Sequence, residues 1–198
     1  MPITNGYATL DEVKAILRLT DATDDTLLEN AIESASRRVD GFCGRFFYQQ
    51  SATIALFAWD AHRLPLINDL VSITTLKTDD NGDGSFETTW TTNVDYRLEP
   101  LDTVLQTRPY RRVTAIGAKT FPLFAVPNLA GCQVNGTWGW SSVPDDVAEA
   151  TKLLAIRHFA RYNAALGVVG FADMAIQVRA VDPDVRDLLN PYRKIGVA

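Results

Sequence analysis

The fold is decided by a stretch with helical periodicity, TLLENAIESASRRVDGFCG at residues 26–44. Its apolar residues recur every three or four positions and would share one helix face: Leu28, Ile32, Ala35, Val39 and Phe42. On the opposite face Glu33 precedes Arg37 by four residues, the order that stabilises a helix. Gly41 and Gly44 are expected to end it. The stretch therefore predicts an amphipathic helix whose apolar face needs a partner.

A shorter helix is expected before this stretch. Thr9 and Glu12 are spaced as a capping box, in which each side chain satisfies a free backbone amide. The apolar residues that follow fall on one face and predict a helix ending near Leu19: Leu10, Val13, Ile16 and Leu17. The polar residues 20–25 separate the two helices.

A long helix is predicted after Val143. Pro144 suits the first helical position, and Asp145 and Asp146 favour the positive end of the helix dipole. The helix should run to about Ala165. Apolar residues cover nearly its whole circumference: Val147, Ala150, Leu153, Leu154, Ile156, Phe159, Ala160 and Tyr162. Such a helix must be covered on most sides, so part of its cover is expected from the sheet and part from another subunit.

The last part of the chain predicts a short strand and a short helix. Residues 166–180 are apolar and glycine-punctuated, with Ile176, Val178 and Ala180 alternating as in a strand. Asp182 as cap and Pro183 in the first turn then predict a helix that ends at Asn190-Pro191.

Between residues 46 and 140 the pattern is that of β structure. Strands are expected over Thr53–Trp59, Leu70–Lys77, Ser85–Thr91, Tyr96–Leu98, Arg112–Ile116 and Gln133–Trp138. The turn residues Asp79–Gly84 predict a hairpin. Four prolines favour edge strands and loops over a large closed sheet: Pro100, Pro109, Pro122 and Pro127.

These patterns predict an α+β fold. A small α-helical bundle of two N-terminal helices, one long helix and one short C-terminal helix would carry an inserted antiparallel β region. Residues 1–45 form the N-terminal part of the bundle and residues 46–140 the inserted β-hairpin region. Residues 141–198 supply the long helix, an apolar loop, the C-terminal helix and the tail.

Composition excludes several classes of protein. With 198 residues, 46% hydrophobic and 22% charged, the chain is an ordinary globular protein and not a disordered one. Its net charge of −5 argues against a dedicated nucleic-acid binder. No apolar run is long enough to span a membrane, and the start does not resemble a signal peptide. The two cysteines, Cys43 and Cys132, are expected as free buried thiols in a reducing compartment.

No sequence motif indicates catalysis or a cofactor. The chain lacks a Gly-x-Ser-x-Gly elbow, a phosphate-binding loop and a dinucleotide fingerprint. Two cysteines and two histidines, none at ligand spacing, do not make a zinc site. His158, between two arginines on the long helix, suits a helix-end or interface role. We therefore expect no enzyme and no cofactor.

One segment matches the first half of a calcium-binding loop. Asp79, Asn81 and Asp83 alternate and Gly84 follows, but the twelfth position, where a bidentate glutamate belongs, is Trp90. Turn chemistry explains the same residues without an ion. An ordinary hairpin turn is the favoured interpretation, and weak calcium binding is the alternative.

The densest basic cluster is a short segment with an aromatic residue inside it. It contains Arg108, Arg111 and Arg112, together with Pro109 and Tyr110. Such a segment could contact phosphates or pair with acidic groups of a protein partner. Because the chain is acidic overall, we favour the protein partner.

Three stretches together resemble a known family, the head–tail connector (adaptor, or head-completion) proteins of long-tailed bacteriophages. The first comprises residues 8–14, 27–35 and 44–47, that is, ATLDEVK, LLENAIESA and GRFF. The second is GTWGWSSVPDDV at 136–147, which leads into the long helix. The third is DPDVRDLLNPYR at 182–193.

The resemblance implies a structural assembly protein at the head–tail junction, or neck, of a virion, present in the bacterial host cytoplasm before assembly. Such proteins form a ring, typically of twelve copies, under the portal protein. The ring extends the channel through which genomic DNA passes, without sequence-specific binding, and offers a platform for the next neck or tail-completion protein. An acidic chain suits such a conduit, because like charge repels phosphate, and we expect more acidic than arginine side chains along the channel.

The resemblance also suggests which residues bind partners. By analogy the C-terminal helix and tail would bind the portal, and the basic segment and the Asp79–Gly84 hairpin would contact ring neighbours or the tail side. The candidates are Pro183, Val185, Leu188, Leu189, Tyr192, Arg193, Arg108, Arg111 and Arg112. The alternatives are a different neck or tail-completion module that stays monomeric until it docks, and a weak calcium-binding hairpin module.

Overall fold

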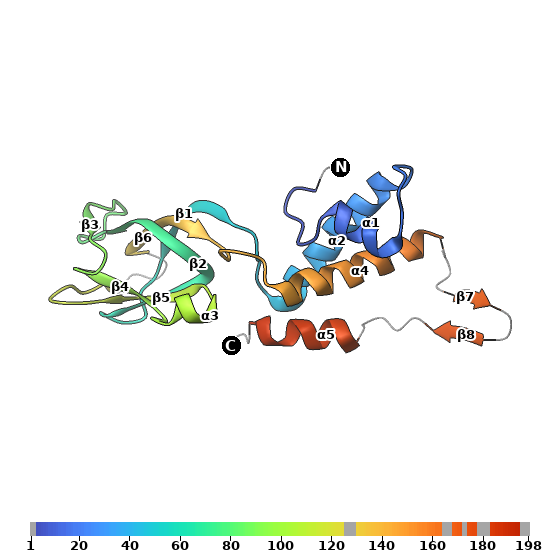
Figure 1. Ribbon diagram of the computed structural model, residues 1–198. Coiled ribbons are helices and arrows are strands. Elements are labelled where there is room, and N and C mark those ends of the chain that lie inside the picture. The colour runs from blue at the N-terminus through green and yellow to red at the C-terminus, as the bar shows by residue number, and fades with distance from the viewer. Residues whose placement is uncertain (1–2, 125–129, 164–167, 172–173, 178–182, 195–198) are drawn as a thin grey trace. The chain divides into compact units, whose positions relative to one another are not determined.

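The computed structural model describes residues 3–124, 130–163, 168–171, 174–177 and 183–194 (Figure 1). The chain divides into two compact units. We call Met1–Phe47 together with Ser142–Ala198 the helical unit, and Tyr48–Ser141 the sheet unit. The predicted α+β fold is confirmed, because the chain contains both α-helices and a six-stranded antiparallel sheet.

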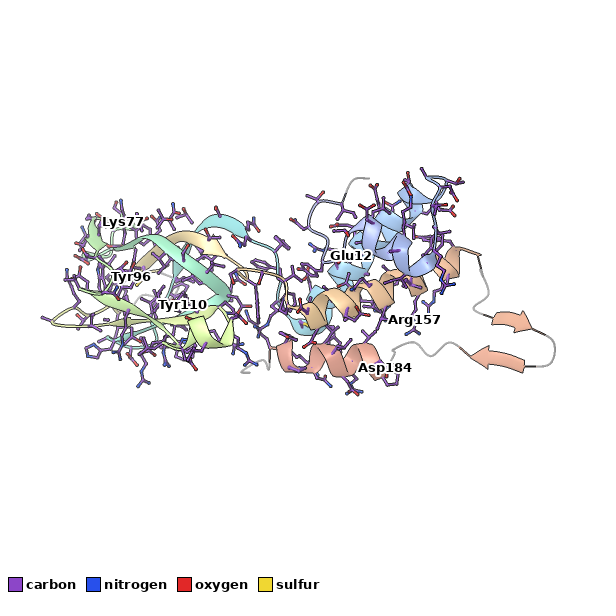
Figure 2. All side chains as sticks on the ribbon, viewed as in Figure 1. Glu12, Lys77, Tyr96, Tyr110, Arg157 and Asp184 are labelled. Carbon is purple, nitrogen blue, oxygen red and sulfur yellow. The ribbon has the colours of Figure 1, made fainter. Side chains whose placement is uncertain are left out.

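The first helix, α1 (Leu10–Leu17), begins with the predicted capping box. The Glu12 amide donates to Thr9 Oγ1 at 3.3 Å, and the Thr9 amide donates to Glu12 Oε2 at 2.7 Å (Glu12 is labelled in Figure 2). The helix ends at Leu17 and not near Leu19, because Arg18 adopts a left-handed conformation with φ 57°. Such a residue closes the last helical turn.

The second helix, α2, spans Asp25–Cys43. Four residues of the predicted apolar face are fully buried: Leu28, Ile32, Ala35 and Val39. Gly41 does not end the helix as expected but lies within it, exposed, while Gly44 ends it with φ 65°. The helix continues through Gly41 to the buried Cys43, so packing outweighs the roughly 1 kcal/mol by which glycine disfavours a helix.

The long helix α4 spans Asp145–Asn163 and lies beside α2. Pro144 stands one residue before it, and its carbonyl accepts a hydrogen bond from the Ala148 amide at 3.0 Å. The predicted end at Ala165 lies outside the described residues. The buried side chains of α4 are Val147, Ala150, Thr151, Leu154 and Ala155, whereas Leu153, Ile156 and Phe159 are half-buried and Tyr162 is exposed. The helical unit thus covers α4 only in part.

Aromatic contacts link the last helix to the N-terminal segment within the helical unit. Helix α5 (Pro183–Leu189) continues as a 3-10 turn, η1 (Asn190–Tyr192). The ring of Tyr192 packs edge-on against Phe47 at 6.0 Å, and Phe47 packs edge-on against Tyr7 at 5.6 Å. These aromatic contacts join three segments far apart in sequence. The predicted cap Asp182 lies outside the described residues.

The sheet unit contains all six predicted strands, with different bounds. They are β1 (Gln50–Leu56), β2 (Arg63–Thr78), β3 (Thr88–Trp90), β4 (Tyr96–Glu99), β5 (Tyr110–Ala115) and β6 (Cys132–Trp138). All pairs are antiparallel, in the order β1-β6-β2-β5-β4, and β3 pairs with β2. The predicted hairpin across residues 79–84 is confirmed by the pairing of β2 with β3.

Strand β2 is twice as long as predicted because it pairs in succession with different neighbours. Its first part pairs with β5, and its second with β6 and β3. Its pairing with β6 is irregular between Ile73 and Thr75. At Ile73 the partner is Gly136, where a Cβ atom would lie 2.2 Å from the Ser72 carbonyl oxygen. The absence of a side chain at residue 136 therefore permits this close approach of the strands.

Two elements were not predicted, and a third was predicted in part. A short helix, α3 (Thr103–Gln106), was not expected at all. A hairpin of β7 (Val168–Phe171) and β8 (Met174–Gln177) contains the expected Ile176, but β7 was not predicted, and Val178 and Ala180 lie outside the described residues.

Both cysteines are free and buried, as predicted. Burial raises the pKa of Cys43 to about 11 and that of Cys132 to about 12, so both remain thiols at neutral pH. Among the helices of the described residues, none has the length and apolar character needed to cross a membrane.

Candidate functional site

The basic segment separates into two exposed arginines and one that pairs within the sheet. Arg108 and Arg111 are exposed on either side of the buried Pro109. Arg112 lies opposite Glu99 on β4, and its Nε donates to Glu99 Oε2 at 2.9 Å. Burial opposes ionisation of Glu99, but the hydrogen bonds and the positive charge of Arg112 outweigh it and hold the pKa of Glu99 below its usual value. Within this segment, Arg108 and Arg111 are thus the arginines most available to a partner.

A mainly apolar pocket of about 220 Å³ lies beside this segment in the sheet unit. Its lining residues are Leu70, Val71, Thr103, Thr107, Arg108, Pro109, Tyr110 and Ser141 (Tyr110 in Figure 2). Among these lining residues, only Arg108 was predicted as a site residue, and its side chain is exposed. The others were missed because the unpredicted α3 brings Thr103 beside strands β2 and β5.

The sheet unit exposes several large apolar side chains. They are Phe57, Trp59, Ile67, Val94, Leu101, Leu105 and Leu123. Leu105 in α3 is 88% exposed and Trp59 is 69% exposed. Single exposed apolar residues are normal in a folded protein, whereas contiguous apolar patches mark contacts with other proteins.

The C-terminal candidates fall into a buried and an accessible group. Val185 and Leu189 are 4% and 2% exposed, so they belong to the core of the helical unit. Leu188 is half-buried, and Pro183 and Arg193 are exposed. Of the predicted candidates in this region, Pro183, Leu188 and Arg193 are therefore the ones most accessible to a partner.

Tyr192 is half-buried and thus lies between the buried and the accessible group of candidates. Its ring packs on Phe47, and its hydroxyl donates to Asp146 Oδ2 at 3.1 Å. The neighbouring Arg193 guanidinium lies over the ring of Phe42 at 5.7 Å. These contacts fix the start of the tail against the helical unit.

The turn at residues 79–84 is held by its own side chains. Asp79 is buried, and its Oδ1 accepts the amides of Asn81 at 3.2 Å and Gly82 at 2.6 Å. Its Oδ2 accepts the amide of Gly84 at 2.8 Å. Every carboxylate oxygen of Asp79 is thus engaged with the backbone, as turn chemistry requires.

The structure adds one acidic residue to the calcium candidates. Glu87 brings its carboxylate within 4.8 Å of those of Asp79 and Asp83. Glu87 Oε2 also accepts the Asp80 amide, and Asp83 Oδ1 accepts the Ser85 amide at 2.7 Å. A cation would have to displace amide donors from this cluster, which disfavours calcium. Glu87 stands at the ninth position of the calcium-loop pattern, a signal that sequence reasoning overlooked.

His158 on α4 lies in positive surroundings. Burial lowers its pKa, and Arg38, Arg161 and Arg157 lower it further because they repel the imidazolium (Arg157 in Figure 2). His158 is therefore neutral at pH 7 and has an electrostatic environment that opposes its protonation.

Comparison with known proteins relates the chain to phage assembly. Residues 7–64 match the family of phage gp6-like head-tail connector proteins. This segment comprises α1, α2, β1 and the first residues of β2. No curated protein sequence matches the chain.

Solved structures of particle necks resemble the whole chain. One is the "Neck of empty GTA particle computed with C6 symmetry", with 22% identity, a TM-score of 0.58 and coverage of 100% of this chain and 95% of that one. Two others are the "Neck of native GTA particle computed with C12 symmetry" and the "Virion of native gene transfer agent (GTA) particle". Each has 25% identity, a TM-score of 0.56 and coverage of 96% of this chain and 90% of the other. The resemblance to head–tail connector proteins that the sequence predicted is therefore confirmed.

Proposed function

We propose that this chain is a structural head–tail connector that forms a ring of twelve copies in the neck of a phage-like particle. The observation that carries the proposal is the agreement of two comparisons. The N-terminal helices match the connector family, and 96% of the chain matches a neck structure computed with C12 symmetry.

The exposed apolar surface supports assembly into a ring. A cyclic ring uses two different surfaces on each subunit, one for each neighbour. The long helix α4 is only partly covered by its own chain, and the sheet unit exposes large apolar residues such as Trp59 and Leu105. Neighbouring copies would remove these surfaces from water, and each apolar Å² buried contributes about 25 cal/mol.

The portal and the next neck protein are the partners that we propose beyond the ring itself. The accessible residues Pro183, Leu188 and Arg193 suit contact with the portal. Arg108 and Arg111 suit an acidic surface of a ring neighbour or of the next neck or tail-completion protein. Genomic DNA would pass without specific binding, because a net charge of −5 does not favour a grip on phosphate.

The role requires no chemistry from the protein. A connector acts through its shape and contacts, so we propose a function without catalysis. Under this proposal the acidic cluster at Asp79 and Glu87 stabilises a turn, in keeping with its amide hydrogen bonds.

Native mass spectrometry and electron microscopy test the proposal. We expect a species of twelve times the 21.9 kDa chain mass, either from purified protein at high concentration or in necks isolated from particles. Class averages should show a closed ring with twelve-fold symmetry. The proposed function would be overturned if the purified protein stays monomeric at high concentration and the chain is also missing from isolated necks.

A further inference from the structure

One edge of the six-stranded sheet is open and unprotected. Strand β1 is the last in the strand order, and it pairs with β6 along all seven residues. In the described residues no strand pairs with its other edge. Residues 50–56, QSATIAL, contain neither a charged residue nor a proline. Natural edge strands are usually protected by such residues, so an unprotected one is a site for pairing with another strand.

The other edges of the same sheet carry these protections. Strand β4 has only four residues, two of which are the charged Arg97 and Glu99, and Pro100 follows. Strand β3 has three residues and lies beside the charged hairpin turn. The contrast within one sheet indicates that β1 is the edge available for strand addition.

A second element of the chain has complementary properties. Strands β7 and β8 form a hairpin and pair with each other. Their sequences, VVGF and MAIQ, contain no charged residue and are apolar except for Gln177. The main packing contacts between the described elements include neither strand apart from this mutual pairing. An isolated two-stranded hairpin is marginal in water, and it gains stability when a larger sheet accepts it.

We propose that the β7–β8 hairpin of one copy adds to the β1 edge of the neighbouring copy, so that a shared sheet joins the two. This inference rests on the proposed ring, because a ring needs two different complementary surfaces on each copy. The uncharged strands of the hairpin match the uncharged β1 edge, whereas β4 carries Arg97 and Glu99 and the short β3 lies next to the charged turn at residues 79–84. Backbone hydrogen bonds would supply the affinity, as in other strand additions.

The dimensions and surface of β1 permit this contact. Seven residues of strand span roughly 23 Å, and a four-residue strand spans roughly 13 Å, so β1 can pair a whole hairpin strand. Phe57 and Trp59, which follow β1, are 51% and 69% exposed. They extend the apolar surface beyond the end of the strand, where further residues of the neighbour would cover them.

Site-directed cross-linking between copies tests the inference. Rings assembled from equal amounts of Thr53→Cys and Val169→Cys protein are treated with a short bismaleimide. Thr53 is an exposed residue of β1, and the native thiols are buried and protonated, so the unsubstituted chain serves as a blank. The matched control is Thr89→Cys with Val169→Cys, because Thr89 is an exposed threonine on β3 of the same sheet.

We expect a cross-linked dimer from the Thr53 mixture at several times the yield of the Thr89 mixture. The chain with both Thr53→Cys and Val169→Cys should give a ladder of oligomers. If rings form but give no such cross-link, strand addition is overturned while the proposed ring-forming function still stands. A cross-linked monomer from the double variant would show that the hairpin joins its own sheet and would likewise overturn the inference. A chain that forms no ring would refute the proposed function, and the inference with it.

Discussion

The hydroxyl of Tyr7 donates a hydrogen bond to the carboxylate of Asp40, 33 residues later in the chain. The same hydroxyl accepts the amide of Phe47 at 2.8 Å. One phenol thereby connects the N-terminal segment, helix α2 and the segment that leaves the helical unit. Burial and the contact with Asp40 raise the pKa of Tyr7 far above its usual value, so the phenol stays protonated.

The Tyr7→Phe variant should unfold more easily. It leaves the half-buried Asp40 carboxylate and the Phe47 amide without this partner, which costs about 1–3 kcal/mol. Urea unfolding monitored by circular dichroism measures the change. A loss of less than about 0.5 kcal/mol would mean that water replaces the phenol without cost. Tyr162→Phe, at an exposed position of the helical unit, is the control.

The Asp79 turn should not depend on calcium. Asp79→Ala removes the acceptor of three amides and should destabilise the protein by roughly 1.5–3 kcal/mol. Addition of calcium should leave the melting temperature of the unsubstituted chain unchanged. Calorimetric heat at micromolar calcium, lost in an Asp83→Ala variant, would instead support the calcium-binding alternative.

Stability should fall in mild acid because of His158. Its pKa is lowered in the folded chain, so the unfolded chain binds the proton first as the pH falls below about 6.5. The contribution of His158 to the free energy of unfolding is complete above that pH, and it is lost as the pH falls through the lower pKa of the folded state. His158→Gln should reduce the loss between about pH 7 and pH 5. Equal pH profiles of stability for the unsubstituted chain and His158→Gln would show that His158 does not cause the loss. His62→Gln serves as the control.

Two adjacent leucines of α5 should respond differently to the same substitution. Leu189→Asp places a charge in the core and should destabilise the helical unit by more than about 3 kcal/mol. Leu188→Asp, at a half-buried position, should leave the chain folded and prevent its incorporation into necks. Thermal melts and a particle-assembly assay separate the two effects. A Leu188→Asp chain that unfolds would show that Leu188 is a core residue, and one that assembles normally would exclude it from the portal contact.

Sequence patterns predicted those elements whose limits are set by local chemistry. The capping box at Thr9 and Glu12 and the stripe from Leu28 to Val39 appear as expected. Limits set by tertiary contacts were missed. The extension of β2 back to Arg63 depends on pairing with β5, and Pro65 within it hides the strand because proline usually interrupts a sheet.

The candidate site was predicted less completely than the fold. The basic segment and the C-terminal helix were found because charge and helical caps are local signals. The burial of Val185 and Leu189 was not predicted, since one apolar helix face looks the same whether it packs on its own chain or on a partner. The pocket beside Arg108 was missed because it depends on α3, a helix of only four residues.

Gly136 sets a limit on how this chain can diverge. Even an alanine methyl group there would collide with the Ser72 carbonyl, which is backbone and cannot rotate away. The two strands would have to separate, and the irregular pairing at Ile73 would be lost. A descendant that acquires any larger residue at 136 must therefore reshape β2 at the same time, so this position should tolerate almost no exchange.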